Sequence, residues 1–387
     1  MKRDSASSAL FSGATWPPRR FRFGTWIASR FALGWLAVAI PAAAADSTQS
    51  AGKSNRFIFW TEITRLQAVE RAADVAFAHP GLNVVQPVDV AWVLDGAGRD
   101  VAAIACKPIQ DTAEAGELLG RFGAGILRAP IAIGATEASR YVLEASGRLV
   151  VRRPTNAPPP ALATRFDSLA LGLGRDTPID LAVSPLGVIY VLAGNTVRVF
   201  LDPPARDPLY TFSIESAVRP AVALAVSMRG EVYVVGGGQD AIAVYDLDPT
   251  GKYRRVRGTS ARALGVGALG GIALSPILLL PVERREGWVG EDRFVIVSEP
   301  GTGRLLALES ANLTRLTTFD LRTELPDAAP GRLDVSNRGQ IAYVDARSGA
   351  AVSLPAPTFA ALIQPAKIRW RDVDPDSTAR IMGDESP

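Results

Sequence analysis

One short phrase recurs along the chain and constrains its fold more than any other feature. Repeats of roughly 40 to 60 residues with short apolar strands are typical of β-propeller blades, in which each repeat forms a four-stranded antiparallel sheet. Six starts predict an all-β, six-bladed propeller, with seven blades as the alternative. The phrase occurs at intervals of roughly 40 to 60 residues, starting at Pro87 (PVDVAW), Pro130 (PIAIG), Pro178 (PIDLAVS), Pro220 (PAVALAVS), Gly270 (GGIALS) and Pro330 (PGRLDVS).

The third unit shows how one repeat supplies a whole blade. Residues 179–183 predict a short apolar inner strand, and 188–192 a second strand rich in β-branched and aromatic side chains. Residues 196–201 alternate as a third strand does, and 209–214 supply the outer strand. Gly187 provides the turn between the first two strands.

The turn and the strand after it also repeat. The pattern V-S-x-x-G precedes an aliphatic strand with a central tyrosine in units three, four and six. This pattern resembles the NHL-repeat family over residues 87–354, and it is more distantly similar to gluconolactonase-like and regucalcin-like propellers. The resemblance implies a six-bladed propeller. It does not imply one function, because propellers serve many functions. The matching segments are 183–187, 226–230 and 335–339, with Tyr190, Tyr233 and Tyr343 following them.

Ring closure needs a strand from outside the last unit. Residues 56–60 (RFIFW) are a good strand candidate, and we expect them to complete the last blade. Residues 62–86 are harder to interpret, because several apolar side chains partly follow helical spacing and a partial seventh blade is an alternative. Those side chains are Ile63, Leu66, Val69, Ala73 and Val75.

The first 45 residues have the pattern of an export signal. An apolar run at 31–40 follows basic residues and precedes the small residues 43–45. The run is shorter than the ~20 residues that span a bilayer, which favours cleavage over a retained anchor. Arg19 and Arg20 also suggest the twin-arginine route, although Arg22 stands near them where that signal has a hydrophobic residue. We therefore expect a periplasmic or secreted protein.

The expected organisation has four parts. They are a signal peptide at 1–45, a closing strand with an irregular segment at 46–86, the propeller at 87–371 and a polar, disordered tail at 372–387. The signal carries more positive charge than the net +3 of the whole chain, so the rest of the chain is acidic. Without a basic field, no nucleic-acid partner is expected, and cleavage leaves no stable membrane span.

A single cysteine and a single histidine exclude several chemistries. Cys106 lies in the apolar run VAAIACK, which predicts a buried small hydrophobe and leaves no internal disulfide. His79 stands beside Pro80, which predicts a loop residue. Some NHL-repeat enzymes are zinc lyases, but one histidine cannot supply a multi-histidine site, and no G-x-S-x-G motif accompanies it.

Gluconolactonase-like propellers hold a divalent cation with oxygen ligands at the channel mouth. The corresponding inner-strand position in this chain lies two residues after each of the six repeat starts. Two of the six are carboxylates and one is a cation, and Glu62 or Asp334 could add further oxygens. A metal-dependent lactonase is thus the alternative function, while no cofactor or metal is expected. The six residues are Asp89, Ala132, Asp180, Val222, Ile272 and Arg332.

The sequence favours a non-catalytic binding or scaffold module for a protein, peptide or glycan partner. A sugar or small-molecule sensor is a weaker third possibility. The insertion 281–292 is polar and reads as a loop that projects from one face, where propellers often carry function. The candidate binding residues are Asp89, Asp180, Arg332 and, within the insertion, Trp288.

Overall fold

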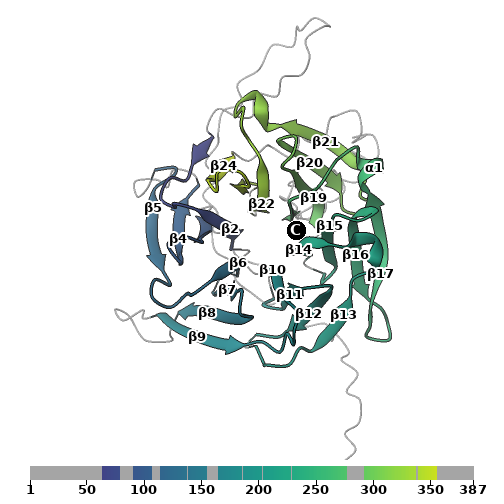
Figure 1. Cartoon of the computed structure of the whole chain (residues 1–387), viewed down its shortest axis with the longest axis horizontal. Coiled ribbons are helices and arrows are strands. Elements are labelled where there is room, and N and C mark those ends of the chain that lie inside the picture. The colour runs from purple at the N-terminus through teal and green to yellow at the C-terminus, as the bar shows by residue number, and fades with distance from the viewer. Residues whose placement is uncertain are drawn as a thin grey trace, which may run out of the picture. The chain divides into compact units, whose positions relative to one another are not determined.

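The computed structural model places six four-stranded antiparallel sheets around a common centre (Figure 1). This confirms the six-bladed, four-stranded propeller. All described residues belong to the unit Phe57–Pro387. The structure describes residues 63–78, 90–106, 114–136, 138–154, 164–184, 186–202, 204–227, 229–276, 292–336 and 339–354.

The four strands of each blade follow one another from the centre of the ring outwards. Blade 1 is β2 (Ala72–Phe77), β3 (Val90–Asp95), β4 (Asp100–Ala105) and β5 (Leu118–Phe122); blade 2 is β6 (Pro130–Ala135), β7 (Arg140–Glu144), β8 (Arg148–Pro154) and β9 (Thr164–Ala170). Blade 3 is β10 (Pro178–Val183), β11 (Ile189–Ala193), β12 (Thr196–Phe200) and β13 (Tyr210–Ser213); blade 4 is β14 (Ala221–Val226), β15 (Val232–Gly236), β16 (Asp240–Leu247) and β17 (Tyr253–Ser260). Blade 5 is β18 (Gly271–Pro276), β19 (Asp292–Glu299), β20 (Arg304–Glu309) and β21 (Arg315–Asp320); blade 6 is β22 (Pro330–Val335), β23 (Ile341–Asp345), β24 (Ala351–Leu354) and β1 (Thr64–Arg65).

The inner strands form a closed ring, because each contacts the inner strand of the next blade and β22 contacts β2. An N-terminal strand completes the last blade, as expected from the sequence. That strand is β1, which pairs antiparallel with β24 through Thr64 opposite Ser353 and Arg65 opposite Val352. The closing strand predicted at residues 56–60 lies outside the described residues.

The first repeat is out of phase with its sequence prediction. The inner strand of blade 1 is β2, and the phrase that begins at Pro87 leads into the second strand, β3. Residues 72–77 therefore belong to a blade rather than to the irregular segment expected at 46–86, and Val75 lies in a strand rather than a helix. The inner strand of blade 1 was predicted wrongly because AADVAF lacks the starting proline, and because the run after Pro87 has that proline and is equally apolar.

The recurring V-S-x-x-G pattern has a direct structural cause. In blade 4 the Ser227 hydroxyl accepts a hydrogen bond from the backbone N–H of Glu231 at 3.0 Å. The same bond joins Ser184 to Val188 and Ser336 to Gln340, at 3.1 Å each. The glycine of each turn has a left-handed φ of 81°, 89° or 78°, which other residues rarely adopt. These glycines are Gly187, Gly230 and Gly339.

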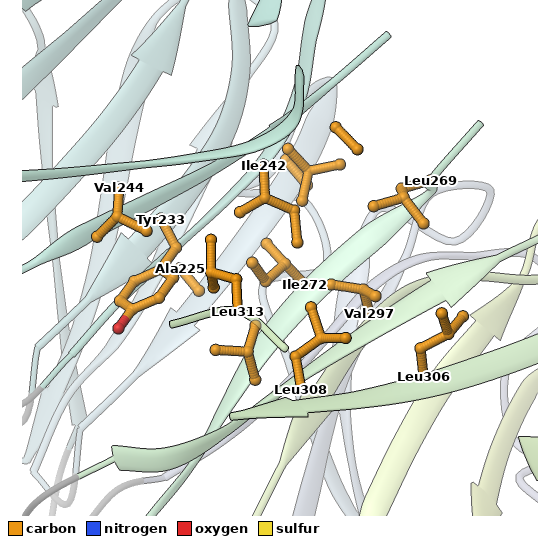
Figure 2. Close-up of a cluster of buried hydrophobic side chains, with 14 of the residues drawn as sticks. Ala225, Tyr233, Ile242, Val244, Leu269, Ile272, Val297, Leu306, Leu308 and Leu313 are labelled. Carbon is orange, nitrogen blue, oxygen red and sulfur yellow. The ribbon is translucent and has the colours of Figure 1, made fainter. Parts of the chain in front are cut away.

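The hydrophobic core lies between neighbouring blades. Second strands such as β11, β15 and β23 are buried along their whole length, because a blade packs on each of their faces. Figure 2 shows one such layer, in which Tyr233 and Ile242 of blade 4 pack with Ile272, Val297 and Leu308 of blade 5. Cys106 is buried in another layer, as the sequence predicts.

Helices within the described ranges are short connections. They are α1 (Ala261–Leu264) and two 3-10 helices, η1 (Ser216–Val218) and η2 (Leu321–Thr323). None of them has the length and apolar character needed to cross a bilayer.

Close packing at the end of β15 generates a stability prediction. A Cβ atom on Gly236 would collide with the backbone carbonyl of Val218, so Gly236→Ala must displace backbone. We expect the free energy of unfolding to fall by about 3 kcal/mol, as over-packing in cores does. A Cβ on Gly120 of β5 would meet open space, so Gly120→Ala is the matched control and leaves stability nearly unchanged. Urea unfolding measures both variants, and equal losses would contradict the packing argument.

Candidate functional site

Two of the four candidate binding residues meet at the centre of the ring. Arg332 lies on β22 of blade 6, and Asp180 lies on β10 of blade 3. The two side chains form an ion pair, and Arg332 Nη2 also donates to the carbonyl of Ile179 at 2.6 Å. Asp74 Oδ2, on β2 of blade 1, is 3.8 Å from Arg332 Nη1. We call Asp74, Asp180 and Arg332 the central clamp, because they tie three blades together.

The repeat register explains why these side chains meet. Asp74 and Asp180 each follow an irregularity near the start of the inner strand, and they stand opposite Leu94 and Leu192 of the second strand. The residue of blade 1 at this position is Asp74, whereas Asp89 lies outside the described residues. In blade 4 the equivalent residue is Ala223 rather than Val222, because PAVALAVS has one residue more than PIDLAVS, and Val222 therefore takes the place of Ile179.

Inner-strand carboxylates also bind the next blade directly. Asp74 Oδ2 accepts a hydrogen bond from the N–H of Ile133 at 2.9 Å, and Asp180 Oδ2 accepts one from Leu224 at 2.8 Å. Asp334 Oδ2 does the same with Phe77 at 2.7 Å, across the point where the ring closes. A hydrogen bond to a charged group contributes about 1.5–3 kcal/mol. These three bonds therefore link blade 1 to 2, 3 to 4 and 6 to 1.

Burial sets the electrostatics of the central clamp. Burial raises the pKa of Asp74 to about 7; the charge of Arg332 opposes this rise, and the charge of Asp180 adds to it. Burial opposes the charged form of Arg332 too, but Asp180 and Asp74 together raise its pKa above the ordinary value. The clamp thus holds a permanent cation beside a carboxyl group that exchanges a proton near neutral pH.

A second group of acids holds the hairpins at the ends of the second strands. Glu144 Oε1 accepts from the N–H of Arg128 at 2.7 Å, and Glu299 Oε1 accepts from Gly267 at 2.5 Å. Asp345 Oδ2 binds the N–H of Ala329 at 2.7 Å in the same way. Although burial alone raises the pKa of these carboxyl groups, their hydrogen bonds hold it below the ordinary value. The carboxylates of these acids therefore stabilise the backbone of the blades.

The remaining candidates are not assembled into a site by the described residues. Trp288, Asp89 and the possible ligand Glu62 lie outside the described ranges, as does His79. Within those ranges, no group of three or more His, Cys, Asp or Glu side chains lies close enough together to hold a metal ion. Sequence reasoning missed Asp74, although its position in AADVAF matches that of Asp180 in PIDLAV.

Comparisons with known proteins found solved structures of low similarity. No family model matches the chain, and no curated protein matches it. The β-propeller domain of Cps50 (Swd1) from Myceliophteria thermophila is 11% identical with a TM-score of 0.47, covering 73% of this chain and 83% of that one. A functionally unknown protein from Desulfotomaculum acetoxidans is 15% identical with a TM-score of 0.45, covering 68% and 77%. A chain of the mitotic checkpoint complex is 12% identical with a TM-score of 0.47, covering 83% and 99%.

The raised pKa of Asp74 predicts a pH effect. The ordinary value is 3.8, so between about pH 4 and about pH 7 the folded protein keeps a proton that the unfolded chain releases. Stability contributed by this carboxyl group therefore falls as the pH rises through that window. Asp74→Asn cannot titrate, so the stability of the wild type relative to this variant should fall over the same range.

Urea unfolding of both proteins across that pH window measures the effect. Asp248→Asn is the control, because the pKa of Asp248 is lowered to about 2 by the Thr250 hydroxyl and neighbouring amides. Its stability difference from the wild type should stay level over the window. A level difference for Asp74→Asn as well would show that Asp74 is ionised throughout.

Proposed function

We propose that this chain is a non-catalytic binding module that holds a protein partner on one face of the propeller. The observation that carries this proposal is the uneven distribution of connections between the two faces of the ring. We further propose that the module works outside the cytoplasm after removal of residues 1–45, and the signal pattern of that segment is what supports this part.

The three longest connections between strands leave from the same face. They join β2 to β3, β4 to β5 and β18 to β19. In an antiparallel four-stranded blade, the connection from the inner to the second strand and that from the third to the fourth strand lie at the same end of the sheet. We call this side of the ring the long-connection face. The end of β24 and the start of β1 lie on it too, by the same rule.

The opposite face serves the scaffold. Its connections from second to third strands are tight hairpins, such as Gly194–Asn195 between β11 and β12. Buried acids such as Glu144 and Glu299 hold the backbone there. Ordering a long connection lowers the conformational entropy of the chain, so long connections are uncommon in compact folds. Those that occur often contain binding residues. Their concentration on one face therefore favours that face as the binding surface.

The central clamp argues against a lactonase-like site at the ring's centre. Asp180 is satisfied by Arg332 and by the N–H of Leu224. Its carboxylate would have to exchange these partners for a cation. Metal content tests this point: elemental analysis of the chain, purified without chelator, should find no calcium or zinc at one ion per chain. One bound ion that Asp180→Asn abolishes would overturn the non-catalytic proposal.

Masking one face at a time tests the binding surface. Cys106 is buried, so a single added cysteine can be coupled selectively to a polyethylene glycol maleimide. Leu186, 74% exposed in the turn between β10 and β11, lies on the long-connection face. Gly301, in the hairpin between β19 and β20, lies on the opposite face, and a Cβ there meets nothing within 4 Å.

The PEG-coupled Leu186→Cys protein, immobilised, should lose most of the partner retained from source-cell extract by the uncoupled protein. The coupled Gly301→Cys protein should keep it. Retention is measured by quantitative mass spectrometry of the bound proteins. Loss in the Gly301 variant alone would place binding on the other face, and no retained protein at all would count against a binding module.

A further inference from the structure

Exposed apolar side chains gather at the long-connection ends of blades 3 and 4, which are neighbours in the ring (Figure 1). Of the seven large apolar side chains that are exposed within the described ranges, four flank connections of these two blades on the long-connection face. They are Leu186 between β10 and β11, Leu201 and Leu209 on either side of the connection from β12 to β13, and Leu247 at the end of β16. Apolar side chains gathered on one part of a surface are typical of interaction sites.

Strand alternation shows which side of the blade 3 sheet each leucine occupies. Val199 of β12 and Tyr210 of β13 stand opposite each other, and both pack in the layer between blades 3 and 4. Leu201 follows Val199 by two residues and therefore lies on the same side of the sheet. Asp202 lies on the other side, where it pairs with an arginine of blade 2. Leu209 precedes Tyr210 directly, so it also lies on the blade 2 side.

Blade 4 presents a leucine and a tyrosine to the same layer. Leu247 of β16 stands directly opposite Tyr253 of β17, and Tyr253 packs between blades 3 and 4. The ring centroids of Tyr253 and Tyr210 are 5.9 Å apart, and the Tyr253 hydroxyl lies 3.4 Å from that of Tyr190 on blade 3. Leu201 and Leu247 are 53% and 41% exposed, and Tyr210 and Tyr253 are partly exposed. We call Leu201, Tyr210, Leu247 and Tyr253 the blade 3–4 patch.

Buried aromatic rings hold the tyrosines of the patch in place. Phe212 stacks on Tyr253 with centroids 4.6 Å apart and 18° between the ring planes, and it contacts Tyr245 at 5.2 Å on its way into the core. Tyr210 meets Tyr253 edge-on, at 76°. Rings that the core already orders lose little conformational entropy when a ligand binds. Tyrosines with such support are common among the residues that dominate binding energy.

The blade 3–4 patch offers hydrogen-bond donors to a ligand. Burial raises the pKa of Tyr253 above its ordinary value, so its hydroxyl keeps its hydrogen at neutral pH. Each hydroxyl has one hydrogen, so only one of Tyr190 and Tyr253 donates in their mutual contact, and the other hydrogen is left for a ligand or water. Within the described ranges, the hydroxyl of Tyr210 has no hydrogen-bond partner.

The charges beside the patch are paired or directed away from it. Asp202 and Asp248 each form an ion pair with an arginine. Asp246 precedes Leu247, so alternation directs its side chain to the other side of β16, where it accepts a hydrogen bond from the N–H of Leu247 at 2.7 Å. Its charge also helps to raise the pKa of Tyr253, which keeps that hydroxyl a donor. Charge complementarity therefore selects an uncharged ligand, since a charged one would lose hydration at the patch without gaining a counterion.

We propose that the blade 3–4 patch docks an uncharged, proline-rich segment of the protein partner in the polyproline II conformation. Proline rings and aliphatic side chains of this segment pack on the two tyrosines and the two leucines, and the tyrosine hydroxyls donate to its carbonyl groups. Proline supplies a carbonyl acceptor and no N–H donor, and polyproline II leaves its carbonyls free of internal hydrogen bonds. Aromatic surfaces recognise such segments in other proteins. This proposal rests on the proposed binding function and names the chemistry of the partner.

A pair of peptides tests the proposal. The probes are a fluorescein-labelled peptide of repeated Pro-Pro-Leu and the same peptide with alanine in place of every proline, compared by fluorescence anisotropy. Polyproline II has three residues per turn, so the leucines of the first peptide lie along one side of it. The wild type should bind the proline peptide at least tenfold more tightly than the alanine peptide. Added salt should leave this preference unchanged, because screening weakens only contacts between charges.

Two leucines with the same exposure supply a variant and its matched control. Leu201→Ser removes an apolar side chain from the patch and should weaken binding of the proline peptide at least fivefold. Leu209→Ser changes the same residue type at the same exposure of 53%, in the same connection but on the blade 2 side, and should bind like the wild type. Tyr253→Phe keeps the ring and removes the hydroxyl, so it should weaken binding about threefold, as loss of one hydrogen bond does.

Two results would overturn the proposal: equal binding of both peptides by the wild type, or a loss of affinity in Leu209→Ser as large as in Leu201→Ser. Either result leaves the binding function testable by itself. If the immobilised Leu201→Ser protein still retains its partner and masking at Leu186 still blocks retention, the module binds a partner by other contacts. If neither the wild type nor this variant retains a partner, the binding function itself fails.

Discussion

The closed ring of inner strands is the constraint on which the rest of this structure depends. A single blade cannot bury both faces of its sheet, so each needs a neighbour on either side, and the series is complete only when blade 6 meets blade 1. Two interactions secure that junction. The β1 strand pairs with β24, and the carboxylate of Asp334 binds the N–H of Phe77 on the first inner strand. Since Cys106 has no second cysteine to pair with, packing and these polar bonds hold the ring together.

The central clamp shows how a propeller can place charges at its centre without leaving them unpaired. Burying an ion pair costs desolvation energy that its attraction offsets only when further hydrogen bonds satisfy the remaining atoms. Asp180 meets this condition through Arg332 and Leu224, and Asp74 meets it through Ile133 and Val75. The cost that remains is concentrated on Asp74, whose pKa rises to about 7. The clamp therefore specifies which blades face each other more than it adds stability.

The sequence predicted local features well and long-range neighbours poorly. The strands of the third unit, predicted at 179–183, 188–192, 196–201 and 209–214, agree with β10 to β13 to within one residue at each end. Turn chemistry explains this success, because Ser184 and Gly187 fix the hairpin through local bonds. The strands of the first blade were predicted wrongly, because β2 lacks the proline that starts most of the other inner-strand phrases. Without that signal, Asp74 was not recognised as the equivalent of Asp180.

Contacts between blades explain why the candidate site could not be completed from the sequence. Asp180 and Arg332 were both identified, and a ring of six blades in chain order places blades 3 and 6 opposite each other. The sequence does not show that the two side chains reach across the ring and form an ion pair. The stacking of Arg152 on Phe122 depends in the same way on the packing of blade 2 against blade 1. Arginine is informative here because the ring uses it repeatedly in ion pairs, as Arg257 with Glu231 shows. Among the described residues no carboxylate pairs with Arg152, and the sequence does not distinguish it from Arg257, because the partner of a blade arginine depends on which strands and blades pack beside it.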